Sequence, residues 1–223
     1  MGDGAEAEDA DVDLLGLIAA AEAVVVVRVE DSVELAPEAA VPDGDQTDVP
    51  LVLCRVETVL SGASPGETFV LWTRPAYLAN GIPQAVIDCR YLLFLRARPL
   101  APDLLSGTRG DGRRVFERLP GEGAVLLEMP PEVRARMAVV FGEEAFAEVF
   151  ESERPPLDRR LRRATGVDPL GSAEPFLAAV REACAFLAEP ARREALREAS
   201  RASDSVWRRW LATRYDAWNQ RGR

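Results

Sequence analysis

Three apolar segments between residues 51 and 98 constrain the fold of this chain more than any other feature. They read LVLCRVETVL at 51–60, ETFVLWTR at 67–74 and DCRYLLFLRAR at 88–98. Their β-branched and aromatic residues, partly in period-two alternation, are typical of strands. The sequence SGASPG between the first two segments supplies glycine and proline, which favour tight turns. We therefore predict a β-hairpin over residues 51–74.

Further strand signals flank these segments. The run AVVVVRVE at 23–30 predicts a strand covered on both faces, and the acidic, proline-containing stretch 31–50 predicts a long mobile loop. Two short apolar runs at 115–119 and 124–129 flank a Pro-Gly-Glu-Gly sequence and predict a closing hairpin. Short strands separated by turn sequences favour a small closed barrel, which we expect to have five strands.

Helical periodicity replaces strand periodicity beyond Met129. Pro130-Pro131 predicts a helix start, and the first helix is expected to place one face on Val133, Met137, Val140 and Phe141. Later helices are predicted around residues 146–150, over 172–188, from Pro190 to about Ser200, and from a cap at Ser203 and Asp204 onward. A short helix is also expected from Asp11 or Asp13 through Ala21.

The residue types present restrict the chemistry of the chain. It contains no histidine, and all 27 basic residues are arginine. Histidine-based catalysis, histidine-bearing zinc motifs, Schiff-base lysines and lysine-dependent phosphate loops are therefore excluded within this chain. We expect no enzyme activity, no cofactor and no metal site. An enzyme would depend on carboxylates such as Glu57 and Asp88, and no spacing singles out that pair.

The three cysteines form no CxxC pair. Cys54 and Cys89 lie in predicted strands and Cys184 in a predicted helix, where a buried free thiol is the ordinary state. A disulfide between Cys54 and Cys89 is the alternative.

Charge is distributed unevenly along the chain. Residues 1–50 carry 14 acids and one base, whereas residues 130–223 carry 17 arginines and 15 acids. Such an acidic chain is a poor match for nucleic acid, whose affinity for proteins depends on phosphate neutralisation. The run Asp158–Arg163 could bind phosphate, but it reads more simply as a solvated helix face.

The N-terminal region predicts a location. It begins with acids where a secretory signal would be basic, and no run of about 18 apolar residues occurs. We expect a cytoplasmic protein without a membrane span.

The strand runs carry a family resemblance. AEAVVVVRVE, LVLCRVETVLSG, PGETFVLWTR and CRYLLFLR, in this order, resemble bacterial proteins with a tissue-inhibitor-of-metalloproteinase-like (NTR-like) OB fold. The resemblance covers residues 12–129 and implies an OB-like barrel. It does not carry the inhibitory function, because tissue inhibitors place an N-terminal cysteine on the catalytic zinc and the first cysteine here is Cys54.

The expected fold class is α+β. An acidic disordered tail over 1–10 precedes a five-stranded OB-like β-barrel over 11–129, and a mainly α-helical region follows over 130–223. We predict a noncatalytic protein-interaction module with a protein partner. The expected partner-binding residues on the barrel surface are Arg55, Trp72 and Arg74, because arginine and tryptophan are common among interface hot spots.

The last predicted helix places Trp207, Leu211, Tyr215 and Trp218 along one stripe, with Trp210 beside it. The stripe is expected either to dock on the helices or barrel or, if exposed, to bind the partner through Trp207, Trp210 and Trp218. An alternative function is binding of oligosaccharide or single-stranded nucleic acid by the barrel face, with Trp72 and Tyr91 as stacking residues.

Overall fold

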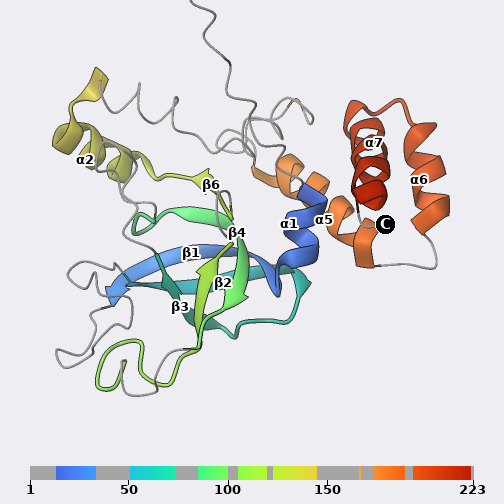
Figure 1. Ribbon diagram of the computed structural model, residues 1–223. Helices are drawn as coiled ribbons and strands as arrows, with labels where there is room; N and C mark the ends of the chain where they lie inside the picture. Colours follow the sequence, from blue (N-terminus) through green and yellow to red (C-terminus); the bar gives the residue numbers. More distant parts are fainter. Residues whose placement is uncertain are drawn as a thin grey trace, which may run out of the picture.

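The protein folds into a β-barrel with helices on two sides (Figure 1). The structure is a computed structural model that describes residues 14–33, 51–73, 85–99, 105–119, 123–144, 166, 173–188 and 193–221. The strands are β1 (Ala23–Val33), β2 (Leu51–Gly62), β3 (Thr68–Trp72), β4 (Arg90–Ala97), β5 (Val115–Arg118) and β6 (Ala124–Glu128). The helices are α1 (Leu14–Ala20), α2 (Pro131–Phe141), α5 (Ala173–Ala188), α6 (Arg193–Arg201) and α7 (Val206–Arg221).

Five strands close into the barrel in the order β1-β2-β3-β5-β4, because β4 pairs back onto β1. All of these pairings are antiparallel except β3 with β5. The predicted hairpin over residues 51–74 is confirmed, with Leu51 opposite Trp72. Gly62 ends β2 beside the start of β1, where only glycine fits, because its φ is +79° and an added Cβ would lie 2.0 Å from the Glu22 carbonyl oxygen. The predicted α+β class with an OB-like barrel and C-terminal helices is confirmed.

The valine run of β1 is buried on both faces, as predicted. Val25, Val27 and Val29 belong to the cluster that fills the barrel, whereas Val24 and Val26 face the cluster under the C-terminal helices. Alternation of side chains along a strand explains this division, since each face of β1 meets a different apolar layer.

The predicted closing hairpin is wrong. β5 and β6 both run antiparallel to β4 along the same edge, β5 opposite residues 95–97 and β6 opposite residues 90–93. Phe94 bridges the two segments, because its carbonyl accepts from Leu119 N–H at 2.9 Å and its own N–H donates to Gly123 at 2.9 Å. A Cβ at Gly123 would lie 2.6 Å from the Leu119 nitrogen. The two segments are therefore one interrupted strand, and β6 is an addition to the five-stranded barrel.

A third apolar cluster covers part of the outer barrel face. It consists of buried residues from β1, β2, β3 and β5 together with Leu105, namely Val33, Leu51, Leu53, Val70, Trp72, Leu105 and Val115. Gly110 lies directly on this layer, since its added Cβ would be 3.0 Å from Val70 and 3.1 Å from Val33. The connection over residues 105–114 thus closes over the outside of the barrel.

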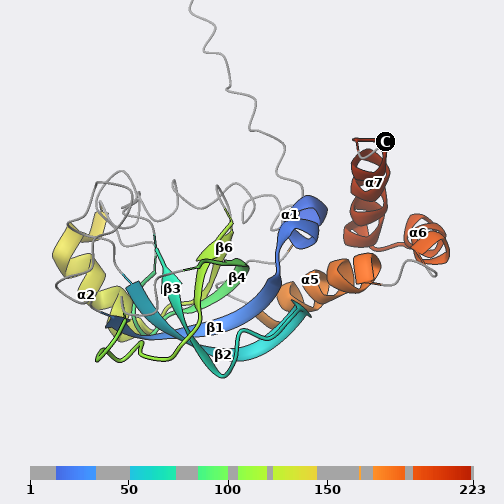
Figure 2. The same ribbon diagram turned by 60° about the horizontal axis from the view of Figure 1, so that its bottom comes forward.

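The C-terminal helices pack on the opposite part of the barrel exterior. α1, α5 and α7 share one cluster with Val24, Val26, Leu92 and Phe94, and Phe176 of α5 is fully buried in it. Figures 1 and 2 place α1 beside α5 and α7, with α2 on the far side of the barrel. The core under the helices therefore includes both the predicted barrel segment and the predicted helical segment.

Two helical details differ from the sequence prediction. Val133 of α2 is buried, but Val140 is 72% exposed and does not share its covered face. The cap of α7 is Ser205, whose Oγ accepts from the Arg208 backbone N–H at 3.4 Å, in place of the expected Ser203 and Asp204. The predicted disordered tail at 1–10, the loop at 34–50, the helix near 146–150 and the run Asp158–Arg163 lie outside the described residues.

Candidate functional site

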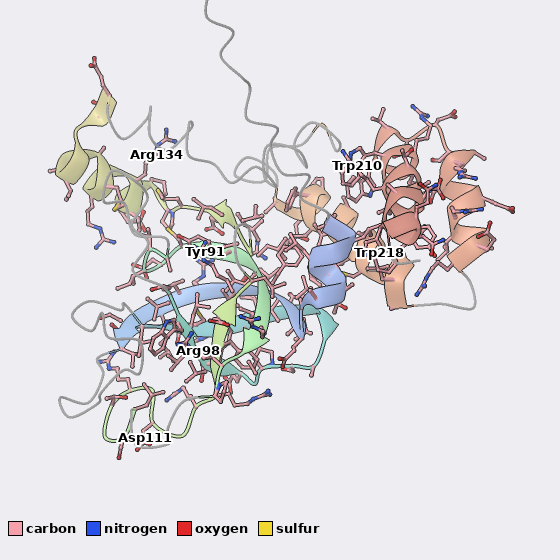
Figure 3. The ribbon with its side chains drawn as sticks, viewed as in Figure 1. Tyr91, Arg98, Asp111, Arg134, Trp210 and Trp218 are labelled. Carbon is pink, nitrogen blue, oxygen red and sulfur yellow. The ribbon has the colours of Figure 1, made fainter. Side chains whose placement is uncertain are left out.

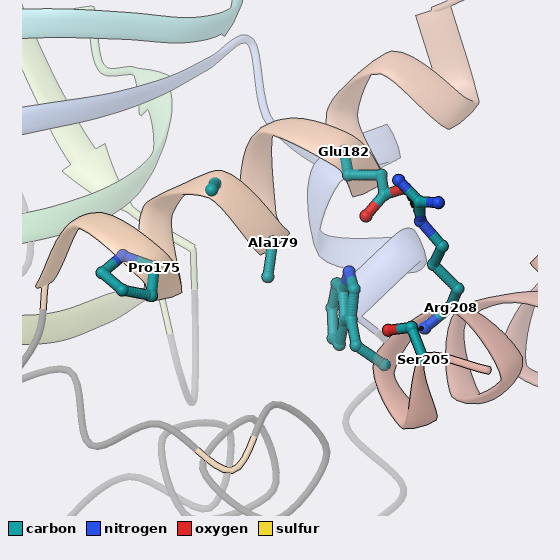
Figure 4. A pocket seen from close by; sticks show the side chains of 7 residues that line it. Pro175, Ala179, Glu182, Ser205 and Arg208 are labelled. Carbon is teal, nitrogen blue, oxygen red and sulfur yellow. Dashed lines mark hydrogen bonds and ion pairs between the residues drawn. The ribbon is translucent and has the colours of Figure 1, made fainter. Parts of the chain in front are cut away.

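A groove lies between α5 and the start of α7 in the helical layer (Figure 4). Its volume is about 640 Å³, within the range of ordinary ligand pockets. Among the described residues, its lining consists of Pro175, Ala178, Ala179, Glu182, Ser205, Trp207 and Arg208. We call this hollow the α5–α7 groove.

Small side chains on α5 leave room for the groove. Ala178 is exposed and Ala179 is buried, and both line it from α5, as does Pro175 in the first turn. The opposite wall comes from the start of α7, where the Ser205 cap fixes the first turn and hence the directions of Trp207 and Arg208. The groove therefore has an apolar wall of small residues facing an indole.

Trp207 is buried at 7% exposure and joins the core below the groove. Its ring stacks on that of Trp210 with centroids 5.0 Å apart and an interplanar angle of 21°. Its indole Nε1 is buried and has no hydrogen-bond partner among the described residues. Buried tryptophan N–H groups normally find a partner, so this one is an exception in the core below the groove.

A charged pair marks the rim. The Arg208 Nε donates to Glu182 Oε1 at 2.6 Å, and their side chains are 53% and 34% exposed. Exposed ion pairs contribute little to stability, so this pair can exchange partners at low cost. The rim offers a cation next to the apolar wall.

The aromatic stripe of α7 is internal, the first of the two predicted alternatives. Trp207, Leu211 and Tyr215 are buried in the helix–barrel cluster, while Trp210 and Trp218 are half-buried against it. Figure 3 shows Trp210 and Trp218 on the helical side of the molecule. Of the predicted partner-binding residues that the structure describes, Trp207 alone lines the groove.

The barrel residues predicted to bind a partner are Arg55, Trp72 and Arg74, and those that the structure describes do not form a shared exposed surface. Trp72 is 4% exposed, so its prediction as a surface residue is wrong. The physical reason is tertiary, because the outer cluster and Arg98, whose Cζ lies 4.2 Å from the indole centroid, cover the ring. Arg55 is exposed and pairs with Glu30 at 2.5 Å. Arg74 lies outside the described residues.

Glu117 completes the group beside Trp72. It is buried and accepts from Arg96 Nε at 3.0 Å and from Arg98 Nη1 at 2.9 Å. Burial by itself raises the pKa of Glu117, but the hydrogen bonds and charges of the two arginines lower it further, so the net pKa is below its ordinary value. This group is a satisfied ion cluster on the barrel wall.

Trp72 and Tyr91, the expected stacking residues for oligosaccharide or single-stranded nucleic acid, are not on the surface. Tyr91 points into the barrel, is 6% exposed and accepts from the Val86 N–H at 3.0 Å (Figure 3). Burial raises its pKa well above the ordinary value for tyrosine. With Trp72 also covered, neither aromatic residue can stack on a base or a sugar ring as placed.

The two candidate carboxylates are engaged elsewhere. Glu57 accepts from Arg28 Nε at 3.2 Å and from Arg90 Nε at 2.6 Å. Asp88 has a positive φ of 70°, and its side chain lies 3.7 Å from Arg136. Among the residues that the structure describes, no group of three or more carboxylate or thiol side chains could hold a metal ion.

All three cysteines are free and buried. The alternative Cys54–Cys89 disulfide is excluded, because the two residues pair with Val29 from opposite sides and so lie two strands apart, about 9 to 10 Å between backbones. Burial raises the pKa of Cys89 and of Cys184 to about 12, with Asp88 adding to the effect at Cys89. Burial and the nearby Glu30 raise the pKa of Cys54 as well.

Sequence reasoning missed most of the groove. The α5 contributors are alanines, a proline and a glutamate, which give no binding signal on their own, and Arg208 is one arginine among many. Only the position of Trp207 on the α7 stripe pointed to this region.

The comparisons with known proteins add no family. No protein-family model matches the chain, and no curated protein matches it either. In the described part of the chain, no helix is both long and apolar enough to cross a membrane.

Proposed function

We propose that this protein is a noncatalytic interaction module whose α5–α7 groove binds a short acidic segment of a partner protein through one apolar anchor side chain. The observation that carries the proposal is the combination of two apolar walls with a cation at the rim. Ala178 and Ala179 form one wall and Trp207 the other, and Arg208 is the cation. An apolar side chain fits between the walls, and a neighbouring carboxylate fits Arg208.

The charge of the surrounding helices supports an acidic partner. Residues 192–223 carry nine arginines against four acids. Complementary charge accelerates association and excludes cationic competitors. A closed barrel supplies a rigid base, since α5 buries Phe176, Leu177 and Val180 against it.

Two finer expectations belong to the same proposal. A cytoplasmic location is supported by three free thiols, which a reducing compartment maintains. Kinship with the NTR-like family is supported by the five-stranded barrel formed by the residues that carry the resemblance. Carbohydrate and nucleic-acid binding receive no support from the barrel face, where Trp72 and Tyr91 are buried.

The test uses a peptide library displayed on phage and selected against the full chain. We expect the selected peptides to combine acidic residues with one large apolar residue. Ala178→Trp, which fills the groove from an exposed position, should weaken a selected peptide at least about tenfold, or 1.4 kcal/mol. Ala185→Trp is the matched control, because Ala185 is exposed on α5 and is not part of the groove lining described above.

Fluorescence polarisation of the labelled peptide measures its affinity for wild type and for both variants. Equal affinity of wild type and Ala178→Trp would contradict the groove as the binding site. Selection of basic or purely polar peptides would contradict the proposed partner chemistry.

A further inference from the structure

The segment that precedes α1 has the composition proposed above for a partner. Residues 1–13 contain no base, and their six acids are Asp3, Glu6, Glu8, Asp9, Asp11 and Asp13. The same segment contains Val12 and Met1 as apolar side chains. It is thus a short acidic sequence with apolar anchors.

The segment also joins the fold next to the groove. It leads into α1, which begins at Leu14 and packs against both α5 and α7. Figure 4 shows the blue ribbon of α1 passing behind the groove. Thirteen residues span up to about 45 Å when extended, whereas the 16 residues of α7 measure about 24 Å. Every part of the groove is therefore within reach.

The cations at this end of α7 have partners that are easily exchanged. Arg208 is held only by the exposed pair with Glu182 among its described contacts. Arg209 is exposed, and its described side-chain bond goes to the Ser203 carbonyl oxygen at 2.8 Å, not to a carboxylate. Arg208 and Arg209, which are neighbours in sequence, can therefore donate hydrogen bonds to carboxylates of another segment.

We propose that residues 1–13 occupy the α5–α7 groove when no partner is bound and compete with the partner for Arg208 and Arg209. This inference rests on the proposed function of the groove. Tethering makes a weak contact sufficient, because a short linker gives an effective concentration in the millimolar range. The acidic segment thus acts as an internal competitor that raises the partner concentration needed for binding.

A spin label on the full chain tests the contact. The label is attached through Ala5→Cys, and the three native thiols are buried, so they should not compete for it. The readout is the intensity of the indole N–H signals in a nitrogen-15 spectrum. We expect strong broadening of Trp207 and Trp210, with Trp72 on β3 as the internal reference.

Two controls separate docking from mere proximity of a tethered label. The double variant Arg208→Gln, Arg209→Gln should restore the Trp207 and Trp210 signals, as should about 1 M salt, where the Debye length is about 3 Å. A second variant keeps α7 intact and instead changes Asp3, Glu6, Glu8, Asp9 and Asp11 to their amides. Its matched control neutralises the same number of acids at Glu34, Glu38, Asp43, Asp45 and Asp48.

The outcomes are decisive in either direction. Broadening that disappears in the arginine variant, in high salt and in the segment variant, but persists in the matched control, supports the proposal. Broadening that is unchanged by these treatments, or equal at Trp72 and Trp207, overturns it.

A binding measurement separates this inference from the proposed function. If the segment occupies the groove nine-tenths of the time, neutralising five of its six acids should tighten the binding of a phage-selected peptide about tenfold. A peptide that binds in the groove with equal affinity to wild type and the segment variant overturns only the internal competitor. If selection against the segment variant also gives no peptide that binds in the groove, the proposed function itself is overturned.

Discussion

The barrel and the helical layer satisfy their buried polar groups to different degrees. Inside and around the barrel, the Tyr91 hydroxyl and the Glu117 carboxylate have hydrogen-bond partners. In the helical layer, three buried side-chain nitrogens of the described chain have none, and these are Arg193 Nε, Arg197 Nε and Trp207 Nε1. Buried groups without partners cost free energy.

The difference follows from how each region is built. Barrel strands are joined by backbone hydrogen bonds in fixed register, so closure leaves few groups unpaired. Helices satisfy their own backbones and meet one another only through side chains, so α5 and α7 can leave a groove. The polar groups named on the barrel are therefore paired, whereas the described part of the helical layer contains a groove and three buried nitrogens without partners.

The largest expected effect comes from opening the barrel core. Phe69→Ala removes a fully buried ring that lies edge-to-face on Phe116, with centroids 5.3 Å apart and an interplanar angle of 77°. We expect a loss of about 3 to 5 kcal/mol in the free energy of unfolding, measured by urea denaturation with circular dichroism. Val139→Ala, at an 85% exposed position on α2, is the control and should change stability by less than about 0.5 kcal/mol. Similar losses for the two variants would contradict a continuous barrel core.

Trp207 provides the corresponding test in the helical layer. Trp207→Ala should cost about 3 kcal/mol, because the indole is 7% exposed and stacked on Trp210. Trp207→Phe should cost less than about 1.5 kcal/mol, since it retains an aromatic ring and removes the unpaired N–H. Thermal unfolding distinguishes the two. Equal losses would mean that the N–H makes a bond in solution.

Glu117 tests the satisfied polar group of the barrel wall. Glu117→Gln should lower stability by about 2 kcal/mol near pH 7, because it removes a charged acceptor from Arg96 and Arg98. The pKa of Glu117 is lowered in the folded state, so its stabilisation is complete above the unfolded pKa of about 4.3 and is lost as the pH falls through the folded pKa. The unfolding free energies of wild type and variant should therefore begin to approach each other as the pH falls below about 4.3, and should meet only below the lowered folded pKa. A difference that is constant with pH would contradict this role.

The smallest expected effect is on the reactivity of the thiols, which are present in both regions and so allow a direct comparison. Cys54 and Cys89 lie in the barrel cluster and Cys184 in the helix–barrel cluster. Burial raises all three pKa values, to about 12 for Cys89 and Cys184, so few thiolates exist near pH 8. We expect slow reaction with a disulfide reagent in the native protein and rapid reaction of all three thiols in urea. Faster native reaction of Cys184 alone would indicate that the helical layer opens locally.

Local sequence determined the elements because their causes are local. The valine run of β1, the hairpin turn between β2 and β3 and the helix start at Pro131 depend on neighbours within a few residues, and each was predicted at its observed place. The aromatic stripe of α7 likewise follows from helical spacing, which places Trp207, Leu211 and Tyr215 on one face.

Tertiary structure decided which of these faces are covered and which stay open. Alternation along β3 places Val70 and Trp72 on one face and Leu71 on the other, but only the loop around Gly110 determines that the face of Val70 and Trp72 is covered. β5 and β6 continue along one edge of β4 because Phe94 bonds to both sides of the interruption, a pairing between residues about 25 to 30 positions apart. The α5–α7 groove likewise needs Ala178 and Trp207, which are far apart in sequence, to face each other. Hydrophobic periodicity and turn residues act within one helix or strand, so they can be read from the sequence. Buried faces and grooves arise from packing between elements that are distant in sequence, so only the folded chain reveals them.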